Sequence, residues 1–381
     1  MWQLFRQPDA EADGFEFVLY SDSVPLLAPG EPHAAGPLTV WSTGPDAGLG
    51  FGARLVLRAW PASPVDDPGA SEAFTEGGER QFLAVMQKSA QWWLGEAVDE
   101  EVAALLSLGM GIRMRSGSIT RRFTAGGDPA GSPEWHNHLV PVLPAVPDHL
   151  VQIHFIRGIE TPFALAWKLV QEVPRVSATE AFVLVRAAIQ YAEALWVVDS
   201  DPQLAWLRLV TALEGVAVHV QAEANLLPDL IRKQFPHTAD AVQGADGEIP
   251  PKVLSEFDNL LGAGARFTEF TTRFAPGAYD PRPPVEFQVD FDNLGPRLKK
   301  IYDHRSKLLH EGHPFPPMLV AGIPERFDNG AWAEQPGDTV HLTGSAGWSP
   351  QDLPMHLWTF AHIAQSAILN WWRSVPKSDP T

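Results

Sequence analysis

Two residues of this sequence, Arg305 and His310, have the types and the spacing that chemistry on a phosphate requires. They stand five positions apart in the segment RSKLLH. A histidine exchanges a proton near neutral pH. An arginine can hold phosphate oxygens through paired hydrogen bonds and stabilise the charge that builds up on them. His310 could then deprotonate a ribose 2′-OH or protonate the leaving 5′ oxygen, so the pair predicts RNA cleavage without a metal ion.

A helix is expected from about Leu294 to Glu311, and it carries both residues. Leu298 and Ile301 continue its apolar stripe, and the next position of that stripe is Arg305. An arginine that faces a core needs a partner. That partner is either an acidic side chain in an internal ion pair or a phosphate at the rim of an interface.

Helix geometry limits how one chain can present the pair. Five positions separate two residues by about 140° around the axis and about 7.5 Å along it. Arg305 and His310 therefore do not lie on one face of the helix. Two copies that face each other across a dimer axis would place both arginines and both histidines around one phosphodiester, so a homodimer is expected.

Basic residues gather around the pair although the chain as a whole is acidic. There are 28 Lys+Arg against 46 Asp+Glu, a formal net charge of −18, which argues against indiscriminate coating of nucleic acid or of an anionic membrane. One basic island, residues 297–307, has five cations against one acid. The other, residues 112–123, has four arginines and no acid, and is expected to be a loop that faces phosphate or is solvated or paired between domains. The predicted RNA-binding residues are Lys299, Lys300, Lys307, Arg113, Arg115, Arg121 and Arg122.

The segment RSKLLH resembles the diagnostic motif of the HEPN superfamily, an arginine followed after four to six residues by a histidine, and the chain is similar to the Apea-like HEPN proteins linked to bacterial anti-phage defence. The run 207–215 resembles the family's first core helix, apolar residues that lead to a glutamate, here Glu214. The resemblance covers about residues 175–375. It implies a dimeric, metal-independent endoribonuclease that acts as a toxin or defence effector. Arg305 and His310 would be catalytic and Glu214 and Ser306 supporting, with no cofactor and with RNA as substrate.

Other interpretations of the same residues remain open. Arg305 and His310 could be a buried ion-pair arginine and a histidine placed favourably against the end of a helix dipole. Glu214 either orients Arg305 across the bundle or is an exposed helix residue. His304 and His313 are expected to be solvated. For the whole chain, the alternatives are a HEPN-like module that dimerises or binds a partner or nucleotide without cutting, and a small-molecule sensor built on the N-terminal sheet.

The expected fold class is mainly α, a C-terminal HEPN-like helical bundle preceded by an N-terminal α+β domain. The chain has 381 residues, of which 45% are hydrophobic, enough for two domains with substantial cores. Strand-like runs at 15–20 and 53–58, separated by Pro/Gly-rich stretches, predict a small sheet. The expected domains are 1–165, which would sense a trigger or bind a regulatory partner, and 175–376, the bundle.

Helical periodicity dominates the second half of the chain. The acidic residues from Asp99 onward suit the first turn of a helix. Asp201 followed by Pro202 is typical of a helix start, and Ser349 followed by Pro350 predicts the start of the last helix. The core face of that helix is expected to be Leu357, Phe360, Ala364, Ala367 and Trp371. Further helices are expected over 79–108 and 182–196, and shorter ones around 228–235 and 251–261.

Other chemistry is excluded by what the sequence lacks. There are 0 Cys, which removes disulfides, thiolate catalysis and Cys-type zinc sites. No P-loop, dinucleotide-binding fingerprint or nucleophile elbow occurs in its proper setting. His136 and His138 lack a partnering carboxylate pattern, so strand histidines are expected rather than a metal site. No stretch could cross a bilayer unaided and the N-terminal residues lack a secretory signal, so a cytoplasmic protein without membrane contact is expected.

Overall fold

The chain is mostly helical with a small sheet, as the sequence predicted. The computed structural model describes residues 14–21, 33–35, 38–42, 53–59, 98–123, 163–224, 231–232, 236–242, 249–250, 262–320, 324–337, 341–343 and 346–378. Among these residues, none of the helices combines the length and the apolarity that crossing a bilayer requires. The expected helices over 79–97 and 251–261, most of the one around 228–235, and His136 and His138 lie outside the described residues.

Two compact units make up the chain. The first comprises Met1–Ala145, Ile156–Ala192 and Pro376–Thr381, and the second Val146–Phe155 and Glu193–Val375. The division falls inside one long helix, whereas the domain limits expected from the sequence were 1–165 and 175–376. Each unit is described by itself.

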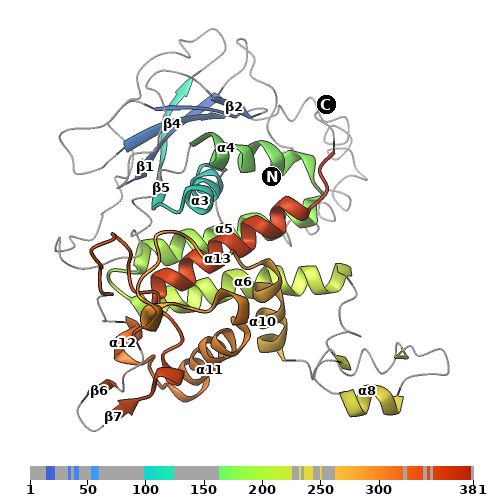
Figure 1. The fold of residues 1–381 in the computed structure, drawn as a ribbon. Helices are drawn as coiled ribbons and strands as arrows, with labels where there is room; N and C mark the ends of the chain where they lie inside the picture. The colour runs from blue at the N-terminus through green and yellow to red at the C-terminus, as the bar shows by residue number, and fades with distance from the viewer. Residues whose placement is uncertain are drawn as a thin grey trace. The chain divides into compact units, whose positions relative to one another are not determined.

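The first unit contains a five-stranded antiparallel sheet in the order β2-β3-β4-β1-β5 (Figure 1). Both predicted strands are present, and they pair so that Phe17 faces Leu57 and Leu19 faces Leu55, all four buried. Alternating apolar residues on neighbouring strands therefore supply the core side of the sheet. The strands are β1 (Gly14–Ser21), β2 (His33–Ala35), β3 (Leu38–Ser42), β4 (Ala53–Ala59) and β5 (Met114–Phe123).

The arginine strip at 112–123 was expected to be a loop, and this is wrong. Most of it forms strand β5. Seven of its ten residues pair with β1, in a register that shifts near Phe17. Among the described strands, β5 is at the edge of this sheet, since only β1 pairs with it. Charged side chains are common on edge strands, where they discourage pairing with another chain.

Helices α3 (Val98–Met110) and α4 (Phe163–Glu172) complete the first unit and pack against the sheet and each other (Figure 1). The acidic residues at the start of α3 lie in its first turn, as predicted. Gly109 permits the close approach of the helices, because a Cβ atom there would lie 2.7 Å from the Cα of Ala166. A short 3-10 turn, Val173–Arg175, follows α4.

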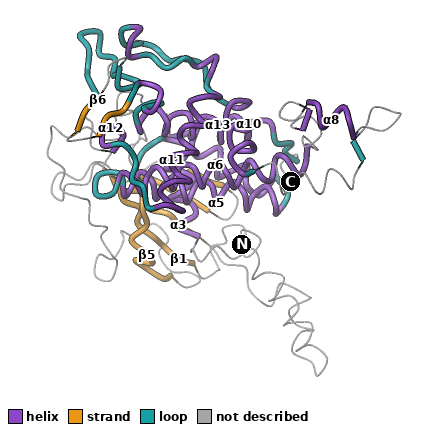
Figure 2. Tube along the Cα trace, turned by 90° about the horizontal axis from the view of Figure 1, so that it is seen from below, coloured by secondary structure: helices purple, strands orange, loops and turns teal. Residues whose placement is uncertain are grey.

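The second unit is a group of helices with short connecting elements. Figure 2 shows α6, α10, α11 and α13 gathered together, and α6, α10 and α13 pack against one another. The helices are α5 (Ala178–Val197), which begins in the first unit, α6 (Pro202–Ala224), α8 (Pro236–Val242), α10 (Ala263–Phe274), α11 (Gly295–Glu311), α12 (Pro317–Val320) and α13 (Leu357–Ser374). The shorter elements are β6 (His341–Thr343), β7 (Ala346–Trp348) and the 3-10 turns η5 (Val285–Phe287), η6 (Phe291–Asn293) and η7 (Pro350–Asp352).

Helix α6 begins where the sequence predicted and carries the centre of the core. The Asp201 carboxylate accepts a hydrogen bond from the Leu204 backbone N–H at 3.0 Å, which is the contact of an N-cap. Further along α6, the fully buried Trp206 stacks on Phe315 and Phe360, with ring centroids 5.4 and 5.0 Å away. The start of α6 is thus local in origin, and its position in the unit comes from aromatic packing.

The last helix was expected to begin at Ser349, and this is wrong. The predicted capping box between Ser349 and Asp352 is present, but it closes a single 3-10 turn. Pro354 explains the difference, because a proline disfavours helical backbone in the residue before it, here Leu353. Helix α13 starts at Leu357 instead, and its predicted core face is buried.

A half-buried histidine of α13 is expected to make stability depend on pH. His362 packs edge-on against Tyr279, and burial lowers its pKa from 6.5 to about 4. As the pH is lowered, His362 therefore becomes protonated near pH 6.5 in the unfolded chain but only near pH 4 in the folded chain. The contribution of His362 to the free energy of unfolding is fully present above pH 6.5. As the pH falls from 6.5 to about 4, the free energy of unfolding decreases by on the order of 2 to 3 kcal/mol. Urea unfolding from pH 4 to pH 7 should show this loss, and His362→Gln should flatten it; an unchanged slope in the variant would assign the effect elsewhere.

Candidate functional site

Helix α11 carries the predicted catalytic pair and ends as the sequence indicated. Gly312 takes up a left-handed backbone with φ 70°. Its N–H donates to the Leu308 carbonyl at 3.2 Å, and the His313 N–H donates to the Lys307 carbonyl at 3.2 Å. These bonds satisfy carbonyls that the helix end would otherwise leave open. His310 consequently lies in the final turn, beside the negative end of the helix dipole.

Arg305 meets Glu214 of α6, which is the partner that its place on the apolar stripe demanded. Arg305 Nη2 donates to Glu214 Oε2 at 3.0 Å. The side chains are 20% and 16% exposed, so the pair lies at the edge of the core. The interpretation of Glu214 as an exposed helix residue is therefore wrong. The contact agrees with the expectation that Glu214 orients Arg305.

The ion pair uses one nitrogen of the arginine. Nε and Nη1 of Arg305 make no hydrogen bond within the described part of the chain, and neither is buried. A guanidinium carries five N–H donors in a planar fork. Arg305 can therefore hold Glu214 with one edge and an anion with another.

Tyr302 completes this cluster and was not singled out by the sequence reasoning. Its hydroxyl donates to Glu214 Oε1 at 2.9 Å, and the Arg305 guanidinium carbon lies 5.4 Å from its ring centroid. Burial, followed by the nearby charge of Glu214 and their hydrogen bond, raises the pKa of Tyr302 to about 12. The hydroxyl is thus a neutral donor at physiological pH. One signal was available in the sequence, because residues three apart on a helix share a face.

Gly264, near the start of α10, makes room for the tyrosine. A Cβ atom at Gly264 would lie 2.7 Å from Tyr302 Cδ1 and 2.9 Å from Cε1, closer than packed atoms approach. Phe267, one turn further along α10, packs on the same ring with centroids 5.6 Å apart. Three helices, α6, α10 and α11, therefore converge on the cluster formed by Glu214, Tyr302 and Arg305.

Replacing this glycine is expected to disturb the cluster. Gly264→Ala should lower the free energy of unfolding by about 1 to 3 kcal/mol, because the tyrosine ring has to move. Gly215→Ala on α6 is a matched control, since a Cβ there meets nothing within 4 Å. It should raise stability by about 0.5 to 1 kcal/mol through helix propensity. Urea unfolding midpoints compare the two, and a similar change in both variants would contradict the tight fit at Gly264.

His310 lies apart from this cluster. Its side chain is exposed, like that of its neighbour Leu309, which is 51% exposed. It forms no hydrogen bond or ion pair with any residue that the structure describes. Arg305 points toward α6, whereas His310 faces solvent, so a single chain does not bring the two together on one face. The geometry agrees with the helical spacing of the sequence.

The other basic residues of α11 differ in how free they are. Lys299 and Lys307 are exposed and Ser306 is half-buried. Lys300 is engaged, since its Nζ lies 3.2 Å from Asp352 Oδ1. This part of α11 therefore keeps two exposed cations on its surface.

The two neighbouring histidines were expected to be solvated, and for one of them this is wrong. The His304 ring lies 2.8 Å from the Asp352 carbonyl oxygen and packs near Phe315, and its pKa is lowered mainly by burial. His313 is exposed, with Nδ1 3.2 Å from Glu311. His304 therefore holds the segment before α13 onto α11, and His313 is free to face solvent.

The arginines of the strip at 112–123 belong to the first unit; Arg113 precedes β5, and the other three lie in it. Arg113 is only 4% exposed and Arg115 is half-buried, so Arg113 is not the open phosphate-facing residue that had been expected. The side chains of Arg121 and Arg122 lie outside what the structure describes.

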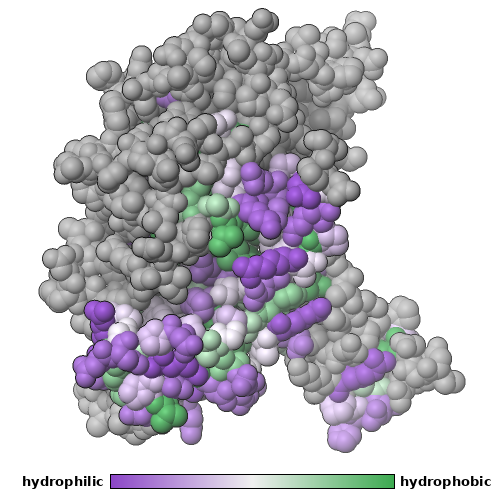
Figure 3. Space-filling view, turned by 45° about the horizontal axis from the view of Figure 1, so that its top comes forward, coloured by the Kyte–Doolittle hydropathy of each residue, from purple (hydrophilic) through white to green (hydrophobic). Residues whose placement is uncertain are grey.

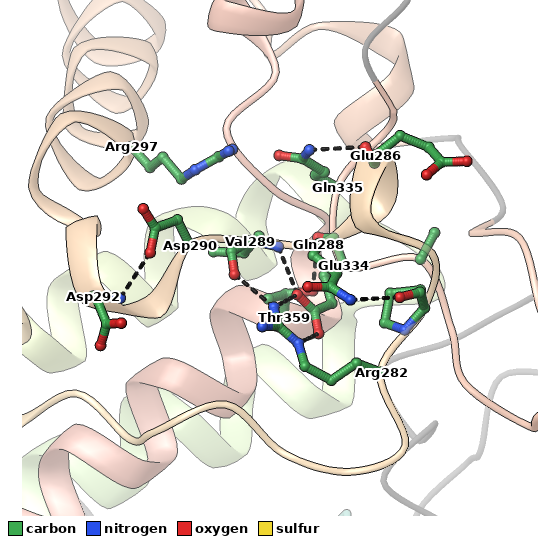
Figure 4. A network of polar contacts seen from close by, with 12 residues as sticks. Arg282, Glu286, Gln288, Val289, Asp290, Asp292, Arg297, Glu334, Gln335 and Thr359 are labelled. Atoms are coloured by element: carbon green, nitrogen blue, oxygen red, sulfur yellow. Dashed lines mark hydrogen bonds and ion pairs between the residues drawn. The ribbon is translucent and has the colours of Figure 1, made fainter.

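A second polar network, shown in Figure 4, lies around Glu334 in the same unit as α11. The Glu334 side chain is fully buried. Arg282 Nε donates to its Oε1 at 3.1 Å and Nη2 to its Oε2 at 2.6 Å, and the Val289 backbone N–H donates to Oε2 at 2.6 Å. Arg282 Nη2 also donates to the Val289 carbonyl at 2.6 Å. The network thus closes upon itself, and it had no signal in the sequence, because Arg282 and Glu334 are 52 residues apart.

This network holds loops rather than presenting groups to a substrate. The Glu334 backbone carbonyl accepts a hydrogen bond from the Thr359 hydroxyl at 2.8 Å and one from the His356 N–H at 2.8 Å. Gln335 Nε2 donates to the Glu286 carbonyl at 3.0 Å. The loop around Val289, the segment at Glu334 and the start of α13 are thereby tied together.

No group of three or more metal-ligating side chains occurs among the described residues. On the face shown in Figure 3, hydrophilic residues cover most of the described surface, with hydrophobic residues in small groups between them. The cluster formed by Glu214, Tyr302 and Arg305 is the candidate site that the described residues support best. Its chemistry is that of a guanidinium of which two nitrogens bind no described residue.

Comparison with known proteins adds no relative to this picture. No family model matches the chain, and neither a curated protein nor a solved structure matches it.

Proposed function

We propose that this protein is a metal-independent endoribonuclease of HEPN type that acts as a homodimer and serves as a toxin or anti-phage defence effector. The observation that carries the proposal is the state of Arg305, held by Glu214 through Nη2 while Nε and Nη1 bind no residue in the described part of the chain. Each two-donor edge of a guanidinium includes Nη2, which carries two N–H bonds. A phosphate can therefore bind Arg305 through the second N–H of Nη2 together with a neighbouring nitrogen, while Glu214 keeps the first.

The exposed position of His310 supports a site composed from two copies of the chain. Leu309 beside it is an exposed apolar side chain, which a partner surface would cover. In the dimer, two copies of His310 and two of Arg305 would surround one phosphodiester. The basic side chains of Lys299 and Lys307 would extend the contact along the RNA backbone.

Such a site needs only proton transfers and charge stabilisation. One His310 takes the proton of the ribose 2′-OH while that oxygen attacks phosphorus. The bond from phosphorus to the 5′ oxygen breaks, and the second His310 gives a proton to that oxygen. Arg305 stabilises the charge on the non-bridging oxygens. The products are a 2′,3′-cyclic phosphate and a free 5′-hydroxyl.

The acidic balance of the chain shapes its substrate. A net charge of −18 repels RNA at distances within the Debye length, about 8 Å at physiological salt. Capture would then depend on the basic side chains of α11, and a structured RNA that matches them would be favoured over bulk RNA. The same repulsion would restrain the protein until a trigger or partner acts.

The test is incubation of the purified full chain with total RNA in the presence of EDTA. Fragments with 2′,3′-cyclic phosphate ends are expected, and an oligonucleotide with a 2′-deoxy substitution at the cut position should stay intact. Cutting of the 2′-deoxy substrate would exclude the proposed chemistry. Intact RNA, together with toxicity in cells that Arg305→Ala and His310→Ala leave unchanged, would favour the alternative, a HEPN-like module that binds a partner without cutting.

A further inference from the structure

We propose that Tyr302 is a positioning residue that keeps the guanidinium of Arg305 open toward phosphate. This inference rests on the proposed function and adds a residue to the same site. Tyr302 does not meet the phosphate itself. It acts through Glu214, by occupying one of the two carboxylate oxygens.

A carboxylate and a guanidinium that have no other partner can satisfy two hydrogen-bonding groups on each side. Such pairs frequently become bidentate, with two parallel N–H···O bonds between the two forks. In this protein Glu214 Oε2 accepts from Arg305 Nη2 at 3.0 Å, while Oε1 accepts from the Tyr302 hydroxyl at 2.9 Å. The tyrosine therefore takes the oxygen that a second arginine nitrogen would otherwise occupy.

The ring of Tyr302 adds an orientation to this restraint. The Arg305 guanidinium carbon lies 5.4 Å from the ring centroid, within the range of a cation–π contact. Gly264 and Phe267 of α10 hold the other parts of the ring. A second guanidinium, that of Arg266 on α10, is near enough for its charge to act on the tyrosine hydroxyl. The charges of two guanidinium groups therefore act on the cluster, in which the carboxylate of Glu214 binds Arg305.

The hydroxyl stays protonated at any pH at which the protein would act, since the pKa of Tyr302 is raised to about 12. The restraint on Glu214 is therefore always in place. It differs from a general acid or base, which would change its protonation state during the reaction.

Tyr302→Phe tests the inference, because it removes the hydroxyl and keeps the ring. Glu214 should then rotate to hold Arg305 through both oxygens, which fills one two-donor edge of the guanidinium and leaves a phosphate only the other edge. The readout is the Nε–Hε NMR signal of Arg305 in the full-length protein, identified by its absence in Arg305→Lys and titrated with inorganic phosphate. Phosphate should shift this signal in the wild type, and Tyr302→Phe should weaken phosphate binding about ten-fold, the size expected when one hydrogen bond to a charged group is redistributed.

A rescue variant separates this role from a merely structural one. Glu214→Gln has one acceptor oxygen, so it cannot hold Arg305 bidentately. Adding it to Tyr302→Phe should restore phosphate binding toward that of the wild type. Tyr191→Phe is the matched control, since the Tyr191 hydroxyl is buried and makes no hydrogen bond with described residues; it should leave the titration unchanged.

Each result decides a separate question. Equal phosphate binding by wild type and Tyr302→Phe, or no recovery in the double variant, would overturn the role of Tyr302. An Arg305 signal that does not respond to phosphate in the wild type would overturn it as well. RNA cleavage that Arg305→Ala abolishes and Tyr302→Phe leaves untouched would remove this inference and keep the proposed function. If Tyr302→Phe loses phosphate binding but the wild type cleaves no RNA, the role of Tyr302 stands and the proposed function is contradicted.

Discussion

Replacing Arg305 or His310 by alanine is expected to lower metal-free RNA cleavage by about 10²- to 10⁴-fold. Loss of a positioned proton-transfer group or of a donor to the developing charge has effects of this size. His310 is exposed and makes no hydrogen bond or ion pair with described residues, so His310→Ala should leave folding unchanged. Initial rates on a defined oligonucleotide, with circular dichroism as a check on folding, measure the loss.

Two controls separate chemistry from general effects of charge or of the helix end. His313→Ala removes another exposed histidine, three residues further on, and should cut at the wild-type rate. Arg305→Lys keeps a positive charge but loses the planar fork, and it should recover little activity. Equal losses in His310→Ala and His313→Ala, or full activity in Arg305→Lys, would contradict the roles assigned to the pair.

Replacing Glu334 by alanine is expected to lower the free energy of unfolding by about 3 to 5 kcal/mol, the cost of breaking a buried ion pair by removing one partner. The Glu334 side chain is fully buried, and its loss leaves both Arg282 and the Val289 N–H without their acceptor. The cost comes mainly from these abandoned donors. Urea unfolding followed by tryptophan fluorescence measures it.

The control for this prediction is an exposed glutamate of the same unit. Glu325→Ala should change stability by no more than about 0.5 kcal/mol, as is usual for surface positions. Replacing both members of the pair, Arg282→Met with Glu334→Leu, should recover much of the loss, since neither charge is then left unpaired. A loss of less than about 1 kcal/mol in Glu334→Ala would show that water or neighbouring groups satisfy the arginine.

Prediction from sequence succeeded where the determining interactions lie within a few residues of one another. A regular apolar stripe predicts helix α11, which ends just before Gly312. Helix α6 starts after the N-cap Asp201. Strands β1 and β4 follow from their alternation between Pro/Gly-rich turns. In each case a short stretch of chain already contains the hydrogen-bonding and burial preferences that decide its structure.

Prediction failed where a distant partner outweighed the local signal. Strand β5 has the composition of a loop but is paired with β1. The capping box at Ser349 is a different case, because the signal that ends its turn is local: Pro354 lies five positions further along the chain. Helix α10 was not expected, although Phe267, Phe270 and Phe274 recur in it at helical spacing. Its packing on α6 and α13 buries Phe267 and Phe270 of this stripe.

For the candidate site, the sequence by itself determined that an arginine stands on a core-facing stripe and therefore needs a partner, and that His310 lies on a different face of the same helix. Only the tertiary structure decided that Glu214 is the partner, that Tyr302 shares its carboxylate, and that Gly264 leaves the space for the ring. The physical reason is the range of the interactions. Periodicity and caps act over one or two turns, whereas an ion pair between α6 and α11 spans 91 residues and forms only after the helices have packed.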